Sequence, residues 1–239
     1  MSINNELICF CGGTFIVLKD CKVERAGKIY RAYQCDLCGT KIIFPKENQT
    51  YYDKKYINNK KSIETIYNDQ KRMLSLWDSY VTEIKSHPFV EKSVIDLGAY
   101  TGYILYKLSQ DGWVVDGVEI NPAFVKYAAQ FYKIVLRQSS IFSIEELSKK
   151  AWGLSLCTEV LDHFVDPFSV LDIMQCISKN SYITVRGSEL FYKYDYFTHL
   201  WYFTEKGIRT LLEKYCPQEL IINKVETEFG SELRLLIQW

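Results

Sequence analysis

The 239-residue chain lacks any long uninterrupted apolar run, which excludes a transmembrane helix. Its first residues, Met1 to Glu6, are polar and no apolar segment follows, so we expect no signal peptide. The chain also lacks net charge, because Lys and Arg together number 29 and so do Asp and Glu. This balance disfavours nucleic acid as a partner, since a phosphate backbone is bound by a basic surface.

Histidine is scarce, with only three residues, whereas cysteine is not. Four of the eight cysteines form two pairs that are each followed by glycine, Cys9-Phe10-Cys11 and Cys35-Asp36-Leu37-Cys38. Four thiolates suit a tetrahedral Zn²⁺, and such usage indicates a reduced, cytoplasmic protein. The first pair is C-x-C where C-x-x-C is usual, so Cys21 is an alternative ligand. Four free thiols in a small β unit are the other alternative.

The centre of the chain, Val94 to Pro122, has the order strand, glycine turn, helix, strand, acid. Gly98 and Gly102 bracket the turn, and Glu119 follows Asp96 by 119 − 96 = 23 residues. An acid at this distance can accept both hydroxyl protons of a ribose. Tyr100 stands where a dinucleotide enzyme needs its second glycine, so a pyrophosphate would be crowded. A ligand with an adenosine but no phosphate fits better.

Other elements can be placed around this stretch. Hydrophobic spacing predicts a long helix over Ser62 to Lys85, and Asn121-Pro122 is a helix start. Residues 46 to 62 are polar and indicate a linker. The remaining strands are expected at Lys133–Leu136, Gly153–Thr158 and Ser181–Val185, with a closing pair at Glu219–Val225 and Glu232–Trp239.

Two motifs carry a resemblance to a known family. Asp96 to Gly102, DLGAYTG, resembles the D-x-G-x-G-x-G signature of class I S-adenosylmethionine-dependent methyltransferases, and Cys157 to Pro167, CTEVLDHFVDP, resembles their E-V-L-E-H-x-x-D-P segment. The resemblance implies an α/β fold, with a Rossmann-like, mostly parallel sheet of seven strands, and S-adenosylmethionine as cofactor. It implies the following cofactor-binding residues: Asp96, Gly98, Ala99, Tyr100, Gly102, Glu119, Ile120, Ser140, Ile141 and Thr158. Ser140 stands where relatives often have an acid that binds the adenine amino group.

The N-terminal segment resembles a zinc ribbon, a unit that commonly precedes small-molecule methyltransferases of this class. Its implied metal ligands are Cys9, Cys11, Cys35 and Cys38. We therefore expect a ribbon-like unit at 1–45, a linker and packing helix at 46–90, and the methyltransferase domain at 91–239. Within the linker, Tyr51 to Tyr56 resembles a Y-x-x-x-Y element that folds over the cofactor in related enzymes. A solvated linker is the alternative.

Two histidines are the catalytic candidates. His163 lies in the second matched motif and either accepts a proton or fixes its loop by hydrogen bonding. His199 begins a run, HLWYFT, that resembles the family's H-x-x-Y-F-[ST] element. It closes the aromatic segment Leu190–Phe203, which is expected to form an acceptor pocket, with plain core or a dimer surface as alternatives.

These features together predict an enzyme that transfers a methyl group from S-adenosylmethionine to a small molecule, such as a sugar nucleotide or a biosynthetic intermediate. An RNA methyltransferase is the nearest alternative, because some ribosomal RNA enzymes also carry an N-terminal zinc ribbon. A non-catalytic protein that binds the cofactor or a partner is the other, and Tyr100 and Ser140 keep it open.

Overall fold

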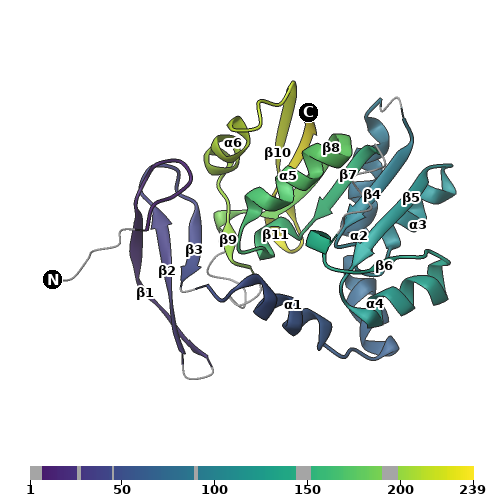
Figure 1. Cartoon of the computed structure of the whole chain (residues 1–239), viewed down its shortest axis with the longest axis horizontal. Coiled ribbons are helices and arrows are strands. Elements are labelled where there is room, and N and C mark those ends of the chain that lie inside the picture. The colour runs from purple at the N-terminus through teal and green to yellow at the C-terminus, as the bar shows by residue number, and fades with distance from the viewer. Residues whose placement is uncertain (1–6, 26–27, 45, 89–90, 144–151, 190–198) are drawn as a thin grey trace.

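The computed structural model describes residues 7–25, 28–44, 46–88, 91–143, 152–189 and 199–239, without the side chains of 19–29. Among these residues the strands form two sheets, one of four strands and one of seven. Figure 1 shows the small sheet beside the larger α/β part of the molecule.

The seven-stranded sheet has the order β10-β11-β8-β7-β4-β5-β6. Its strands β4, β5, β6, β7 and β8 run parallel, and β11 is antiparallel to both of its neighbours. The bounds are β4 Ser93–Leu97, β5 Val114–Glu119, β6 Arg137–Gln138, β7 Trp152–Thr158, β8 Ser178–Arg186, β10 Glu219–Thr227 and β11 Gly230–Gln238. The predicted fold class, a mostly parallel seven-stranded sheet, is confirmed.

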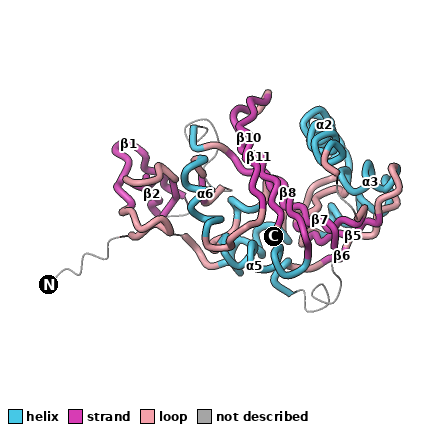
Figure 2. Tube along the Cα trace, turned by 90° about the horizontal axis from the view of Figure 1, so that it is seen from above, coloured by secondary structure: helices cyan, strands magenta, loops and turns pink. Residues whose placement is uncertain are grey.

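Helices cover both faces of this sheet, as Figure 2 shows from above. Their bounds are α1 Gln49–Ile57, α2 Ile63–Ser86, α3 Tyr103–Gln110, α4 Pro122–Tyr127, α5 Pro167–Ile177 and α6 Glu205–Glu213. One core cluster joins α2 and α3 to the sheet through residues such as Tyr80 and Leu105, and a second joins α5 and α6 through Leu171 and Leu211. Strand β4 is buried along its whole length, which explains its apolar sequence. Among the described residues no helix has the length and apolar character that a membrane span requires.

The prediction of a strand at Lys133–Leu136 is wrong, because the ladder with β5 forms only at Arg137–Gln138. A π-helical turn, η1 (Ala128–Tyr132), continues α4 and ends at Lys133 in the left-handed region, with φ 61°. Ile134 and Leu136 are buried while Val135 is 83% exposed. The alternating pattern therefore reflects an extended segment that packs on the core without pairing.

The segment from 46 to 62, predicted to be a linker, contains the helix α1. Asn48 caps it, since its side chain accepts a hydrogen bond from the Tyr51 N–H at 2.9 Å. The helix has little apolar character, so sequence periodicity does not reveal it. Its contacts are polar: the Val165 N–H donates to Gln49 Oε1 at 3.0 Å, and Tyr56 pairs with His163.

The small sheet has the order β1-β2-β3-β9 and combines two distant parts of the chain. Its bounds are β1 Phe15–Arg25, β2 Lys28–Cys35, β3 Lys41–Phe44 and β9 Trp201–Tyr202. The last pairing joins Ile42 to Trp201 and Lys41 to Tyr202. A strand from beyond residue 91 therefore completes the N-terminal sheet, and Phe10 packs between the ring of Trp201 and that of Phe168.

Candidate cofactor cavity and metal cluster

A cavity of about 450 Å³ lies at the carboxyl ends of strands β4, β5, β6 and β7. Open α/β sheets bind ligands at this edge. Side chains from α1 and α2 also line the cavity, among them Tyr56, Met73 and Trp77. The cavity is therefore enclosed by the parts of the chain that precede the sheet as well as by the strand ends.

The glycine turn after β4 forms one wall of the cavity. Gly98 has φ 90°, and a Cβ there would lie 2.8 Å from a methyl carbon of Val160, so the position requires glycine. The N–H groups of Gly98 and Ala99 both donate to the carbonyl oxygen of Val118 at 2.9 Å. This turn ties the end of β4 to the end of β5, where Glu119 stands.

Tyr100 adopts a left-handed conformation, with φ 49°, at the position where the signature has its middle glycine. Its N–H donates to Glu119 Oε2 at 2.9 Å. Its ring packs on Phe124 at 4.1 Å and on Trp77 at 5.7 Å between centroids. The side chain thus contributes an aromatic surface to the cavity in place of the space that a glycine would leave.

Glu119 is 8% exposed, and both of its carboxylate oxygens accept backbone hydrogen bonds. The Asn121 N–H donates to Oε1 at 2.7 Å, and Tyr100 donates to Oε2. Burial raises the pKa of Glu119 to about 7, although these donors act in the opposite direction. Each oxygen has a second lone pair, so the carboxylate can still accept from a diol.

Asp96 is 2% exposed, and its Oδ1 has no hydrogen-bond partner among the described residues. Burial raises its pKa to about 7, and the neighbouring charge of Glu119 contributes in the same direction. A buried carboxylate oxygen without a partner is costly unless a ligand donates to it. The two carboxylates therefore favour a ligand with hydroxyl donors and a positive charge.

Nine of the ten residues that the resemblance assigns to the cofactor line the cavity: Asp96, Gly98, Ala99, Tyr100, Glu119, Ile120, Ser140, Ile141 and Thr158. Gly102 does not line it; this glycine has φ 71° at the start of α3 and packs near Ala128 and Ile134. Ser140 uses its hydroxyl as an acceptor for the Phe142 N–H at 3.5 Å.

A second group of side chains joins the cavity to the small sheet. His163 lines the cavity, and its Nδ1 is 2.8 Å from the Tyr56 hydroxyl. His199 lies behind it, with the two imidazole centroids 4.3 Å apart. Asp162 is fully buried next to both rings; its Oδ2 is 2.6 Å from His199 Nδ1, and its Oδ1 is 4.0 Å from His163 Nε2. The two histidines singled out from sequence are therefore adjacent and share one carboxylate.

The charge of Asp162 is maintained despite its burial. Burial alone would raise its pKa, but the neighbouring His199 and His163, with the hydrogen bond from His199, lower it to about 2. The group also satisfies the donor chemistry of a metal site, since ligand atoms of the three side chains lie within 4.8 Å of one another. A hydrogen bond already accounts for the short contact between His199 and Asp162. His163 and His199, which both face Asp162, are called the histidine pair below.

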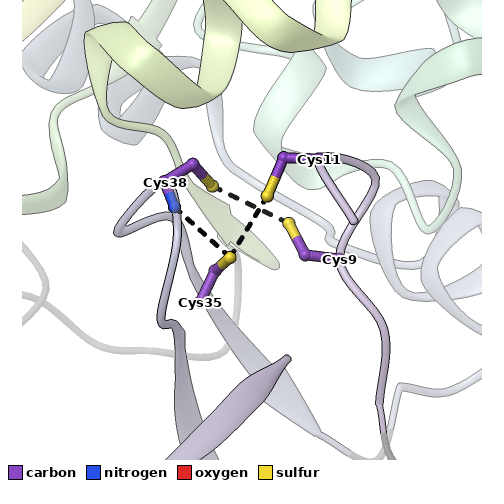
Figure 3. Close-up of side chains that lie close together, drawn as sticks. All are labelled: Cys9, Cys11, Cys35 and Cys38. Carbon is purple, nitrogen blue, oxygen red and sulfur yellow. Dashed lines mark hydrogen bonds between the residues drawn. The ribbon is translucent and has the colours of Figure 1, made fainter. Parts of the chain in front are cut away.

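The four paired cysteines converge on one point, as Figure 3 shows. The sulfur of Cys9 is 3.8 Å from that of Cys38, and the sulfur of Cys11 is 3.3 Å from that of Cys35. All four sulfurs lie within 4.8 Å of one another. A tetrahedral Zn²⁺ with Zn–S bonds of about 2.3 Å places its ligands about 3.8 Å apart, so the cluster fits this ion. The side chain of Cys21 lies outside the described residues.

The backbone around the cluster adopts conformations that favour the glycines following each cysteine pair. The Cys38 N–H points at the sulfur of Cys35 at 3.5 Å. Gly12 and Gly39 have φ values of 83° and 75°. Gly13 is needed for close approach, because a Cβ there would lie 2.7 Å from the Cys35 sulfur.

If the cluster holds Zn²⁺, replacing Gly13 by alanine is expected to weaken its retention at least tenfold, because the added carbon displaces the sulfur of Cys35. Competition with a chromogenic chelator measures this change. Gly12→Asn is the matched control, since nothing lies within 4 Å of its Cβ position and asparagine tolerates positive φ. Equal retention by the two variants would contradict the close-packing argument.

Sequence reasoning missed several features of the site. Asp162 falls inside a quoted motif, but nothing in the sequence pairs it with His199, 37 residues away. Trp77 belongs to the long helix predicted over Ser62 to Lys85, and the structure places it in the lining of the cavity. Most of the aromatic segment proposed as an acceptor pocket, 190–198, lies outside the described residues; Trp201, Tyr202 and Phe203 pack into the two sheets' cores.

Comparison with known proteins supports the fold. No protein-family model matches the chain, and no curated protein does. The structure resembles magnesium protoporphyrin IX methyltransferase from Synechocystis PCC 6803 with bound SAM, at 14% identity and a TM-score of 0.54, covering 80% of this chain and 91% of that one. A bacterial Hen1 methyltransferase domain matches at 19% identity and a TM-score of 0.54, covering 68% of this chain and 97% of that one. The plantazolicin methyltransferase BpumL in complex with SAH matches at 12% identity and a TM-score of 0.51, covering 71% of this chain and 90% of that one.

These likenesses show that the chain has the fold of S-adenosylmethionine-dependent methyltransferases. The cavity lies at the sheet edge where this fold class binds its ligands. The small sheet with its cysteine cluster is separate from the seven-stranded sheet.

Proposed function

We propose that this protein is an S-adenosylmethionine-dependent methyltransferase that acts on a small-molecule acceptor. The observation that carries the proposal is the cavity at the strand ends, in which Asp96 and Glu119 are buried beside a glycine turn and aromatic side chains. The division into a ribbon-like unit at 1–45, a connecting part at 46–90 and a catalytic domain at 91–239 belongs to the same proposal.

The residues of the cavity fit this cofactor. Glu119 would accept hydrogen bonds from the ribose hydroxyls, and the partnerless Oδ1 of Asp96 would receive the ammonium group. Ser140 and Ile141 would contact the adenine. When bound, the cofactor supplies a methyl group that its sulfonium already activates. The chain therefore contributes binding, orientation and exclusion of water.

If the methyl acceptor loses a proton when it is methylated, a side chain of the protein must take up that proton. We propose His163 for this role, because it lines the cavity and its ring is held by the Tyr56 hydroxyl. The buried charge of Asp162 would stabilise the resulting imidazolium, and His199 would keep Asp162 in place through its 2.6 Å contact.

The charge of the cavity bears on the acceptor. Its described lining has five carboxylates, of which Asp69 is paired with Lys61 at 2.7 Å and Glu159 with Arg186 at 2.6 Å, which leaves Asp53, Asp96 and Glu119. An anionic group would be repelled here. We therefore propose that the part of the acceptor that enters the cavity is uncharged or cationic, and that any phosphate of a sugar nucleotide remains outside.

The proposal is tested by methyl transfer from radiolabelled S-adenosylmethionine to a panel of neutral, amino and nucleotide-linked sugars, followed by release of S-adenosylhomocysteine. We expect transfer to at least one member, and loss of transfer in His163→Ala. Transfer to RNA and to none of the small molecules would contradict the assignment of the acceptor.

Cofactor binding is expected to become tighter as the pH rises from about 5.5 to 8. The pKa values of Asp96 and Glu119 are about 7, so both carry protons in mildly acidic solution, and a cationic ligand must displace them. Calorimetry at pH 6.5 in two buffers of different ionisation heat measures this release. Heats that do not depend on the buffer would contradict it.

The free protein should show the opposite trend in stability. Its two raised pKa values exceed the unfolded values of about 3.9 and 4.3. The folded state therefore binds more protons between pH 4 and 7, and these groups lower the free energy of unfolding as the pH rises through that window. Thermal melts with and without S-adenosylhomocysteine separate the two effects.

A further inference from the structure

We propose that the ribbon, meaning strands β1 to β3 with the four-cysteine cluster, positions His199 in the active site and is not only an appended folding unit. The inference rests on the proposed function, since it assigns His199 a part in methyl transfer. Three sets of contacts connect the cysteine cluster to this histidine, and each can be followed along the chain.

The first contacts hold the second cysteine turn on the start of α6. The Thr204 hydroxyl donates to the Cys38 carbonyl oxygen at 2.5 Å, and the Lys206 ammonium donates to the Leu37 carbonyl oxygen at 2.7 Å. Gly207 permits the approach, because a Cβ there would meet the hydroxyl of Thr40 at 2.1 Å. The loop that carries a proposed metal ligand is thus bonded directly to the methyltransferase fold.

The second contacts form a short ladder between β3 and β9. Ile42 and Trp201 are paired, and the Ile43 N–H donates to the Leu200 carbonyl oxygen at 3.4 Å. Strand β9 has two residues and its pairing partner in the small sheet is β3. So short a strand is held by its neighbours: β3 pairs with it in the small sheet, and the next residue, Phe203, bridges to Gly187.

The third contacts join this strand to the histidine pair. The Leu200 N–H donates to the Asp162 carbonyl oxygen at 2.7 Å, and the Trp201 indole N–H donates to the Phe164 carbonyl oxygen at 2.9 Å. His199, which directly precedes Leu200, then reaches the Asp162 carboxylate. The segment is therefore held between the ribbon and the loop that carries His163.

This arrangement places the histidine pair and the cofactor-binding carboxylates at two separate ends of the proposed active site. Asp96 and Glu119 stand on β4 and β5 and make no ladder contact with the small sheet. A loosened ribbon should therefore disturb the histidine pair while cofactor binding persists. In this proposal His199 is a positioning residue that keeps Asp162 in place. Thr204 affects the reaction only by helping to hold His199.

The test compares metal-loaded wild type with Thr204→Val/Lys206→Met, and with Thr204→Ser as the variant that keeps the hydroxyl. We expect the double variant to lose the low-field proton resonance of the His199–Asp162 hydrogen bond and roughly 10²-fold in kcat, since small misplacements have effects of this size. Its Kd for S-adenosylhomocysteine should stay within threefold of wild type. Thr204→Ser should retain the resonance, because it keeps the hydroxyl.

Removal of the metal with a chelator gives an independent second measurement. It should broaden or abolish the same resonance while calorimetry still detects S-adenosylhomocysteine binding. An unchanged resonance in both the double variant and the chelated protein would overturn the proposal. So would loss of cofactor binding together with the resonance, because the ribbon would then support the whole fold. The resonance and the Kd need no methyl acceptor, so they remain informative if the proposed transfer reaction is not found.

Discussion

Asp162→Asn is expected to lower kcat roughly 10²- to 10³-fold while leaving the Kd for the cofactor unchanged, because it removes the charge that stabilises a protonated histidine. The Asp162 carboxylate is fully buried, 2.6 Å from His199 Nδ1, and it faces both imidazoles. An asparagine preserves its volume but carries no charge. The pH–rate profile should move as well, with the base titrating at a lower pH in the variant.

The matched control is Asp166→Asn. This residue belongs to the same motif, but it is exposed and caps α5 by accepting from the Phe168 N–H at 2.9 Å. We expect it to change both stability and activity little, because asparagine caps a helix about as well as aspartate. Similar kcat values for both variants, measured with an acceptor that wild type methylates, would show that the buried carboxylate has no role in the reaction.

Cys38→Ser is expected to abolish binding of the proposed Zn²⁺ and to remove most of the stability of the ribbon. Structural zinc sites of this kind bind with apparent free energies of about 10–16 kcal/mol, and a small β unit has little core to replace that contribution. The ribbon's own core cluster includes three of the proposed ligands, Cys9, Cys35 and Cys38. Metal analysis and a thermal melt measure the loss, which should appear as a separate low-temperature transition.

Cys216→Ser is the matched control, because this free thiol is exposed and lies far along the chain from the cluster. It should retain the full metal content and the wild-type melt. If Cys38→Ser and Cys216→Ser behave alike, the four convergent cysteines do not form a metal site. Cys9→Ser and Cys11→Ser then measure separately whether both members of the C-x-C pair are ligands.

The parallel core of the fold could be predicted from sequence because local signals and burial agree there. The β4 residues Val94 and Ile95 are apolar since the strand is covered on both faces, and Gly98 is a glycine because its φ of 90° and the nearby Val160 exclude a side chain. The acid at the end of β5 follows from the same topology. Each of these features is encoded within about 30 residues.

Features that depend on distant contacts could not be predicted. The Y-x-x-x-Y resemblance marks the segment of α1, but the helix has little apolar character, and no local pattern specifies its bonds to Val165 and His163. Strand β9 is two residues long and exists through its pairing with β3. The contact between Asp162 and His199 joins residues that lie 37 positions apart in the sequence. The same contacts that escaped prediction are those that assemble the proposed acceptor side of the site.

The central claim is that the cavity binds S-adenosylmethionine through Glu119. Calorimetric titration of the metal-loaded protein, wild type against Glu119→Ala, tests it most directly. We predict micromolar binding by wild type, weakened by about 1–3 kcal/mol in the variant through loss of the ribose hydrogen bonds. Absence of binding by folded, metal-loaded wild type would contradict the claim, and so would equal affinity of the two proteins.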